Sequence, residues 1–469
     1  MSEINDAPAE SLIRADGFDC SCGKHHLAGV QYLKIEPGAI RLVPEALAVL
    51  RVQHPLVVCG PFGYEAAGRI VCGLLDRSGI RHTLYRLRSE DTNRLRPSEH
   101  AAGSLLLNFD PDCDLILGVG SGVVNDLCKV LGHAAKLPCM IVATAPSMDG
   151  YASSCASVET DGIKRSIAVR LPAAILCDTD ILSRAPLPMI HAGIGDILAK
   201  YTSLFDWKLS HMITGEYYCA NVAELMNRSL QKTVAAVHYA VDRREDAIHA
   251  VADGLVLSGI GMAFAGSSHP ASGLDHYFSH CWEMLQLERG QDYALHGLQT
   301  GVGMLLTLKI AERMKTIRPD LEHARAAADR FDPAAWERNL RRVFPKAAEG
   351  ILEIESRAQK NERNRRMRRA ERIITIWDDI LKAMDTLPRY DETKDLMLQA
   401  GMPTTPQELG LTADDTADAF VCSRDIRDKY LFSSMIWDIG YMEEISEWLR
   451  EETSRRIELA GPQAASRTA

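Results

Sequence analysis

The sequence predicts an α/β domain built on a parallel sheet, followed by an all-helical domain. Between about residues 28 and 185, short apolar runs lead through turns into helical patterns, which is typical of parallel strands with helices on the sheet faces. From about residue 186 the strand patterns fade and helical periodicity dominates. We therefore expect domains at 28–185 and 186–456, an irregular segment at 1–27 and a disordered tail at 457–469.

Apolar runs and turn signals place the individual elements. Strands are expected at 55–59, 114–117, 139–143 and 173–177, with helices from Tyr64 and at 123–135. A hairpin is expected at 157–169, with its turn at Asp161-Gly162. The helical part is expected to hold helices at 195–209, 217–239, 247–265, 274–287 and 296–314, with more to Arg456.

Composition excludes several classes of protein. The formal net charge of −10 argues against a general nucleic-acid binder, and 46% hydrophobic residues suffice for sizeable cores. The twelve cysteines are mostly scattered in apolar runs, which indicates reduced thiols in the cytoplasm rather than a disulfide framework. We expect neither a secretory signal nor a membrane span, because no basic head precedes an apolar core and no run of about 18 apolar residues exists.

A glycine-rich turn at 118–122 follows a predicted strand and precedes a helix. Gly118, Gly120, Ser121 and Gly122 could let the diphosphate of a dinucleotide approach the backbone at the start of the helix, where Asp126 lies in the first turns. The turn lacks the G-x-G-x-x-G pattern, so a tight strand–helix connection remains an equal alternative.

The loop at 144–154 follows the third predicted strand and offers a second set of polar groups. In a parallel sheet this is the carboxyl edge, where ligands bind. Thr144, Ser147, Asp149, Ser153 and Ser154 could contact a cofactor or a hydroxyl-rich substrate. A loop whose side chains cap their own backbone is the alternative.

Asp196, His276 and His296 form a widely spaced trio of possible metal ligands. One carboxylate and two imidazoles can hold a divalent metal and leave a position open for substrate. Taken singly, Asp196 also suits the start of a helix, and His276 and His280, four residues apart, also suit a core or surface face. We expect the site in a cleft between the two domains.

Two further segments have unusual composition. Cys20, Cys22, His25 and His26 could offer thiolate and imidazole ligands, but no second cysteine pair follows, so we favour a mobile terminal segment. The basic stretch from Lys360 to Arg372 is interpreted as the solvated face of a helix, with a subunit contact or an anionic partner as the alternative.

These motifs together resemble a known family. The glycine turn with Asp126 and Lys129 resembles the dinucleotide loop of iron-containing alcohol dehydrogenases, glycerol dehydrogenases and dehydroquinate synthases. Narrower matches resemble the sn-glycerol-1-phosphate dehydrogenases, particularly the bacterial branch associated with arabinose operons. They lie at 146–151, 193–200, 206–209, 272–276, 280 and 295–297, and the resemblance covers roughly 28–450.

The resemblance implies a dehydroquinate synthase-like fold with NAD or NADP over the glycine turn. It implies one divalent metal, zinc or nickel, at Asp196, His276 and His296, with His280 beside the nicotinamide or substrate. It places Asp149 and Ser153 near the nicotinamide and Thr144 nearer the adenosine. A small phosphorylated three-carbon substrate, a role in phospholipid metabolism, and a homodimer or higher homo-oligomer follow by the same resemblance.

The expected reaction is the reversible reduction of dihydroxyacetone phosphate to sn-glycerol 1-phosphate by NAD(P)H. His280 is a candidate proton relay because imidazole takes both charge states near neutrality. Lys200 is a candidate partner for the substrate phosphate, unless it pairs with Asp196 one helical turn away.

The sequence departs from its relatives at three places, and other functions stay open. Gly60-Pro61 replaces an acid that touches the adenosine ribose, and Asp275 and Leu298 each replace a glutamate. The alternatives are a dehydrogenase of another polyol or polyol phosphate, a dehydroquinate synthase-like lyase, and a non-catalytic metal- or nucleotide-binding regulator.

Overall fold

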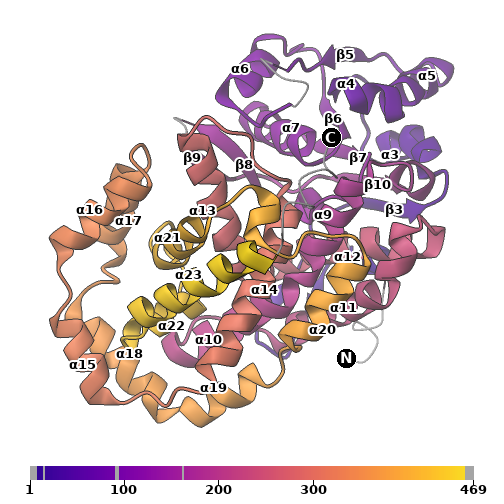
Figure 1. Cartoon of the computed structure of the whole chain (residues 1–469). Helices are drawn as coiled ribbons and strands as arrows, with labels where there is room; N and C mark the ends of the chain where they lie inside the picture. Colours follow the sequence, from indigo (N-terminus) through magenta and orange to yellow (C-terminus); the bar gives the residue numbers. More distant parts are fainter. Residues whose placement is uncertain (1–7, 14–15, 90–94, 161–162, 460–469) are drawn as a thin grey trace. The chain divides into compact units, whose positions relative to one another are not determined.

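The structure is a computed structural model that describes residues 8–13, 16–89, 95–160 and 163–459. The chain divides into two compact units, each formed by two segments of the chain. Unit 1 comprises Met1–Lys200 and Cys219–Ala271, and unit 2 comprises Tyr201–Tyr218 and Ser272–Ala469. Figure 1 shows the strands in indigo to magenta and the C-terminal helices in orange and yellow.

Unit 1 is built on a six-stranded sheet, in which all strands are parallel and follow the order β3-β10-β7-β6-β4-β5. All residues of the four inner strands are buried, as expected for a sheet covered on both faces. The strands are β3 (Tyr32–Glu36), β4 (Pro55–Cys59), β5 (Thr83–Arg86), β6 (Leu115–Gly120), β7 (Cys139–Ala143) and β10 (Ala174–Asp178).

The four inner strands confirm the prediction, since β4 and β7 have the expected bounds and β6 and β10 differ from theirs by one to three residues. Strands β3 and β5, the two edge strands, were not predicted from the sequence. Both contain charged residues, such as Lys34 and Arg86, because an edge strand is only partly covered. Their apolar runs are therefore too short to stand out.

Helices and a hairpin complete unit 1. The predicted hairpin is confirmed as β8 (Cys155–Thr160) paired antiparallel with β9 (Ile163–Ala168), and its turn at 161–162 lies outside the described residues. The helices are α3 (Val43–Val49), α4 (Pro61–Gly63), α5 (Arg69–Arg77), α6 (Glu99–Leu107), α7 (Gly122–Ala135), α8 (Thr179–Leu182), α9 (Leu187–Leu198), α11 (Ala220–Val241) and α12 (Glu245–Ala265).

The N-terminal segment is more ordered than the irregular lead-in expected at 1–27. It contains the short helix α2 (Ala9–Leu12) and an antiparallel hairpin of β1 (Phe18–Asp19) and β2 (His25–His26). A hairpin of two-residue strands gives almost no periodic signal, so residue patterns alone do not reveal it.

Helix α12 is long and apolar enough to cross a membrane by length and composition. However, 83% of its most apolar 18-residue stretch is buried inside the protein, as is typical of a core helix. No other helix in the described ranges meets the same criterion.

In the described part of unit 2 the regular structure is helical throughout, as predicted for the second half of the chain. The helices are α10 (Lys200–Thr214), α13 (Leu274–Glu288), α14 (His296–Met314), α15 (Leu321–Asp329), α16 (Pro333–Val343), α17 (Ala348–Ala358), α18 (Arg363–Thr375), α19 (Trp377–Met384), α20 (Tyr390–Gln399), α21 (Ala413–Ser423), α22 (Phe432–Asp438) and α23 (Met442–Leu459).

Several boundaries differ from the expectation. The single helix expected at 195–209 is two helices, because α9 ends at Leu198 and α10 begins at Lys200. Helices α9, α11 and α12 also belong to unit 1, which contains the sheet, rather than to the helical unit 2. Helix α23 continues to Leu459, and the rest of the tail expected to be disordered, 460–469, lies outside the described residues.

Candidate functional site

The glycine turn and the polar loop lie side by side at the carboxyl edge of the sheet. Strands β6 and β7 are neighbours, and the Thr144 N–H donates a hydrogen bond of 3.1 Å to the Gly120 carbonyl. Helix α7 begins directly after Ser121, so its first N–H groups lie at this edge. The position suits an anion such as a diphosphate, because a helix N-terminus carries unpaired N–H donors and positive potential.

Packing within unit 1 accounts for part of the glycine pattern. A Cβ at Gly120 would lie 2.6 Å from the Val124 side chain, and one at Gly118 would lie 2.9 Å from Cys128 Sγ. A Cβ at Gly122 would lie 3.3 Å from the Met148 side chain, at the loop that follows β7. The tight strand–helix connection, which was the alternative to a dinucleotide loop, is thus present.

Buried polar contacts fix the loop after β7. The Lys129 ammonium donates to the carbonyls of Gly150 and Cys155 at 2.9 and 2.6 Å, and to Ser153 Oγ at 3.1 Å. Asp126 accepts the Ser157 N–H at 3.0 Å and so holds the hairpin. Asp126 and Ser153 therefore have structural partners, and their cofactor contacts stay predictions, as do those of Thr144 and Ser147.

Asp149, Asp196 and Lys200 form a buried charged cluster in unit 1. The Lys200 ammonium lies 2.9 Å from Asp196 Oδ1 and 2.9 Å from Asp149 Oδ2. The Asp149 N–H donates to Asp196 Oδ2 at 2.9 Å, and Ser258 Oγ donates to Asp149 Oδ2 at 2.7 Å. Burial lowers the pKa of Lys200, but the two carboxylates outweigh it and raise the pKa above its usual value. The pairing alternative for Lys200 is thus the one observed.

Asp196 lies near the end of α9, not at the helix start that the sequence suggested. The preceding glycines belong to the helix interior, where Gly193 allows close packing against the polar loop. A Cβ at Gly193 would lie 1.8 Å from the Pro146 carbonyl oxygen. Gly193 therefore lets α9 lie against the loop, where the Asp149 N–H bonds Asp196.

Unit 2 contains the predicted histidines on two adjacent helices. His276 and His280 lie one turn apart on α13, and His296 opens α14. The ring centroid of His296 is 5.2 Å from that of His276 and 5.6 Å from that of His280. The structure therefore brings all three imidazoles together within this unit.

The Nδ1 atoms of His276 and His296 each have a defined partner. A short contact joins His276 Nδ1 to the Asp275 carboxylate, which also accepts bonds from Thr202 Oγ1 at 2.9 Å and from Ser203 Oγ at 3.0 Å. His296 Nδ1 lies 3.0 Å from Ser279 Oγ. Such partners orient imidazoles toward a metal through the opposite nitrogen, Nε2.

Glu283 is a buried acid beside these rings that sequence reasoning missed. Its carboxylate lies 3.4 Å from His296 Nδ1 and 3.9 Å from His280 Nδ1. Ligand atoms of His280, Glu283 and His296 all lie within 4.8 Å of one another, so geometry alone groups a trio other than the predicted one. The spacing of three residues from His280, which puts both on one helix face, was the available signal.

Burial shifts the charge states of several groups in unit 2. Burial, and then Arg427, lower the pKa of His280 well below its usual value, so its ring is neutral at pH 7. This differs from the expected mixture of both states. Burial also raises the pKa of Asp206 to about 7 against two backbone N–H donors at 2.6 Å, and lowers that of Lys429 to about 7. Neither shift had a signal in the sequence.

Comparison with known proteins identifies relatives that match most of the chain. Residues 34–186 match the family model of iron-containing alcohol dehydrogenases. The glycerol-1-phosphate dehydrogenase (NAD(P)+) of Geobacillus thermodenitrificans is 32% identical over 390 residues, which cover 83% of this chain and 88% of that protein. The enzyme of the same name from Halalkalibacterium halodurans is 34% identical over 289 residues, which cover 61% of this chain and 72% of that protein.

Solved structures share the fold at low sequence identity. Glycerol dehydrogenase from Schizosaccharomyces pombe has a TM-score of 0.55 and 17% identity, and covers 91% of this chain and 92% of its own. Sulfoacetaldehyde reductase from Bifidobacterium kashiwanohense, in complex with NAD+, has a TM-score of 0.56 and 14% identity. The match covers 91% of this chain and 98% of that protein. At these identities the likeness concerns the fold.

Proposed function

This chain belongs to the glycerol-1-phosphate dehydrogenase family and is an NAD(P)-dependent oxidoreductase, and we propose that it interconverts dihydroxyacetone phosphate and sn-glycerol 1-phosphate. The observation that carries the proposal is the similarity to the Geobacillus thermodenitrificans enzyme, since it extends over 83% of this chain. The buried polar groups of unit 1 and the three histidines of unit 2 support a metal-assisted hydride transfer.

The donor chemistry fits a divalent metal at Asp196, His276 and His296. One carboxylate and two imidazoles are the mixed O/N set that zinc, nickel and related ions accept, and we propose zinc or nickel here. The Nδ1 atoms of both histidines contact Asp275 and Ser279, an arrangement that orients Nε2 for metal binding. Bound there, the metal would act as a Lewis acid on the substrate's C2 oxygen.

Protein groups position the reactants and handle the proton. Lys200 is proposed as a positioning residue that holds Asp196 and Asp149, rather than as the phosphate partner, because both carboxylates already engage its ammonium at 2.9 Å. His280 is proposed as the proton relay for the substrate hydroxyl, and because burial lowers the pKa of its ring, it would pass the proton on rather than keep it. Asp149 is proposed to approach the nicotinamide from the polar loop.

The dinucleotide is proposed to bind at the carboxyl edge of the sheet and to supply the hydride. The N-terminus of α7 would accept the diphosphate, next to the backbone of Gly120 and Thr144. Ser121, Gly122, Ser147 and Ser153 belong to the same two connections. We further propose a cytoplasmic location, which the reduced cysteines support, and a homodimer, as the family resemblance implies.

The decisive experiment reconstitutes the metal-free enzyme with zinc or nickel separately. Oxidation of NADH and of NADPH is followed with dihydroxyacetone phosphate, and the product is identified with an enantiomer-selective assay. We expect metal-dependent, catalytic turnover that yields sn-glycerol 1-phosphate. Formation of sn-glycerol 3-phosphate alone would refute the substrate assignment, and faster reduction of free dihydroxyacetone would favour the polyol alternative.

A matched pair of histidine variants tests the metal role. His276→Ala is expected to lose turnover while NAD(P)H still binds, because the dinucleotide site is proposed in unit 1. His211→Ala, in the exposed part of α10, is the control and should retain activity. Full activity of a folded, metal-stripped His276→Ala protein would contradict the assignment.

A further inference from the structure

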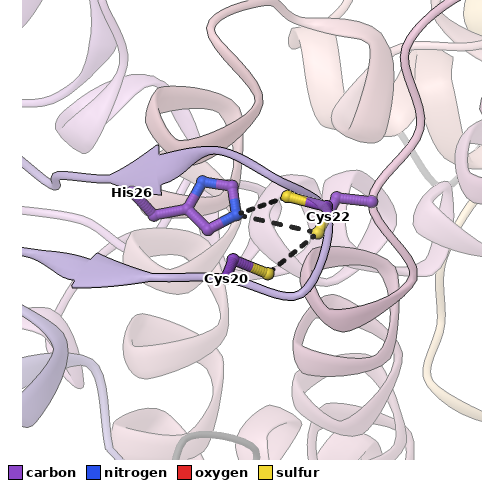
Figure 2. A group of neighbouring side chains, drawn as sticks. Cys20, Cys22 and His26 are labelled. Atoms are coloured by element: carbon purple, nitrogen blue, oxygen red, sulfur yellow. Dashed lines mark hydrogen bonds between the residues drawn. The ribbon is translucent and has the colours of Figure 1, made fainter.

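A second cluster of metal-type ligands lies far from the proposed active-site histidines in sequence. Cys20 and Cys22 stand in the turn between β1 and β2, His26 ends β2, and Cys219 immediately precedes α11. One ligand atom from each of these four residues lies within 4.8 Å of all the others. Figure 2 shows the side chains of Cys20, Cys22 and His26 pointing toward one another.

The separations between these atoms are those of a tetrahedral zinc site. Sγ of Cys20 and Sγ of Cys219 are 3.7 Å apart, and His26 Nε2 lies 3.4 Å from Cys22 Sγ and 3.7 Å from Cys219 Sγ. Around a zinc ion with Zn–S and Zn–N bonds of about 2.3 and 2.0 Å, tetrahedral ligands are separated by about 3.8 Å for two sulfurs and about 3.5 Å for sulfur and nitrogen. Each observed distance is therefore close to the value that a shared central ion requires.

The other ways of satisfying these groups fit less well. A disulfide needs sulfurs about 2.05 Å apart, and the twelve cysteines are all free thiols. His26 Nδ1 lies 2.9 Å from the Phe264 carbonyl oxygen, which fixes that nitrogen as the donor and makes Nε2 an acceptor with one lone pair. Two sulfurs approach this lone pair together, which suits a common cation better than two weak S–H bonds.

Neighbouring groups hold these ligands in place. The Asn221 amide donates to Cys20 Sγ at 3.1 Å and to Ser21 Oγ at 3.0 Å. Hydrogen bonds of this kind orient metal ligands, and the bond from His26 Nδ1 to the Phe264 carbonyl has the same effect. Burial raises the pKa of the Cys219 thiol to about 11, and the Val222 N–H at the start of the 22-residue helix α11 opposes this rise. A bound cation would supply the charge that stabilises the thiolate. His26 and Cys219 are 1% and 0% exposed, so these two ligands are shielded from solvent.

We propose that Cys20, Cys22, His26 and Cys219 bind one zinc ion as a structural site that fastens the N-terminal hairpin to the start of α11. Four protein ligands and three thiolates distinguish it from a catalytic zinc site, which keeps an open position. Its ligands come from within unit 1 and are separate from Asp196, His276 and His296. The site therefore stabilises the fold and takes no part in the hydride transfer.

X-ray absorption on the full-length enzyme tests the proposal with all four proposed ligands in place. The full chain is purified under reducing conditions without chelators, stripped of metal and reconstituted with one equivalent of zinc, in a His276→Ala background that disables the proposed catalytic site. We expect a shell of three sulfurs at about 2.3 Å from zinc. The proposal would be overturned by a spectrum with only nitrogen and oxygen ligands or by the absence of retained zinc. It would also be overturned by a Cys20–Cys219 disulfide that persists under the reducing conditions of purification.

Cobalt(II) substitution and two matched pairs assign the ligands. The double variant Cys20→Ala/Cys219→Ala is expected to lose the thiolate-to-cobalt absorption bands, and Cys72→Ala to retain them. His26→Ala is expected to change these bands and to release the metal to a weaker chelator than wild type requires. His25→Ala should do neither, because that ring is exposed and contacts Asp19 and the Asp16 carbonyl instead. Unchanged bands in a folded double variant would contradict the assignment.

Discussion

Replacing Lys200 by methionine is the sharpest test of the charged cluster in unit 1. Methionine keeps the length of the aliphatic side chain but removes the charge that Asp149 and Asp196 share. The Lys200 and Asp196 side chains are 2% and 0% exposed, and that of Asp149 is 13% exposed. The substitution therefore leaves two carboxylates close together in a buried site, with little water to solvate them.

The structure allows the size of the effect to be estimated. Removing one partner of a buried ion pair costs roughly 3–5 kcal/mol, because the remaining charge stays desolvated. In a unit of this size each kcal/mol lowers the melting temperature by about 2–4 °C, so the expected drop is roughly 6–20 °C. Lys208→Met on the same helix is the control, and since Lys208 is exposed its free energy of unfolding should stay within about 0.5 kcal/mol of wild type.

Metal addition makes the measurement specific for Asp196. If Asp196 is a ligand, the metal neutralises a carboxylate that Lys200→Met leaves without its cation. Calorimetry with and without zinc should then show a larger rise of the melting temperature in the variant than in wild type. Equal stability of Lys200→Met and Lys208→Met without metal would refute the reasoning about burial, and equal metal-induced rises would refute the role of Asp196.

Three further predictions concern packing, ligand orientation and pH. Gly193→Ala places a Cβ 1.8 Å from a backbone oxygen, so we expect a loss of about 1–3 kcal/mol in urea unfolding, whereas Gly350→Ala, with open space around it, should gain about 0.5–1 kcal/mol. Asp275→Ala removes the partner of His276 and should weaken metal binding about 10–100-fold in a chelator titration, with little change in NADH binding. Because burial depresses the pKa of Lys429 to about 7 from its usual 10.5, the folded state binds fewer protons than the unfolded one over that interval. Its contribution to stability therefore rises from pH 7 to about 10, and unfolding curves of Lys429→Met should show a smaller rise.

The sequence was informative where structure depends on local patterns. Inner strands such as β4 and β7 are continuous apolar runs, and α14 begins and ends where periodicity predicted. The helix expected from residue 195 begins at Leu187 instead, and Gly193 serves packing inside it. The local sequence cannot reveal which distant segment of backbone packs against a glycine.

The parts of the sites that could not be predicted depend on contacts between distant residues. Cys219 lies 199 residues after Cys20, so the sequence showed an incomplete ligand set at the N-terminus and favoured a mobile segment. The charge states of His280 and Lys429 depend on burial, which arises only where distant segments meet in the fold. Glu283 had a usable signal in its spacing from His280, but many core helices carry such pairs.

The two halves of the proposed catalytic metal site are each organised within their own compact unit. In unit 1 the Asp196 carboxylate is held by Lys200 and by the Asp149 N–H, and in unit 2 His276 is held by Asp275, which Thr202 and Ser203 stabilise in turn. Each ligand is thus oriented and its charge balanced by neighbours in the same unit. Within each unit these side chains are therefore already ordered by folding, before any metal binds. The same reasoning explains why Asp275→Ala should act on metal affinity while leaving the dinucleotide edge of unit 1 intact.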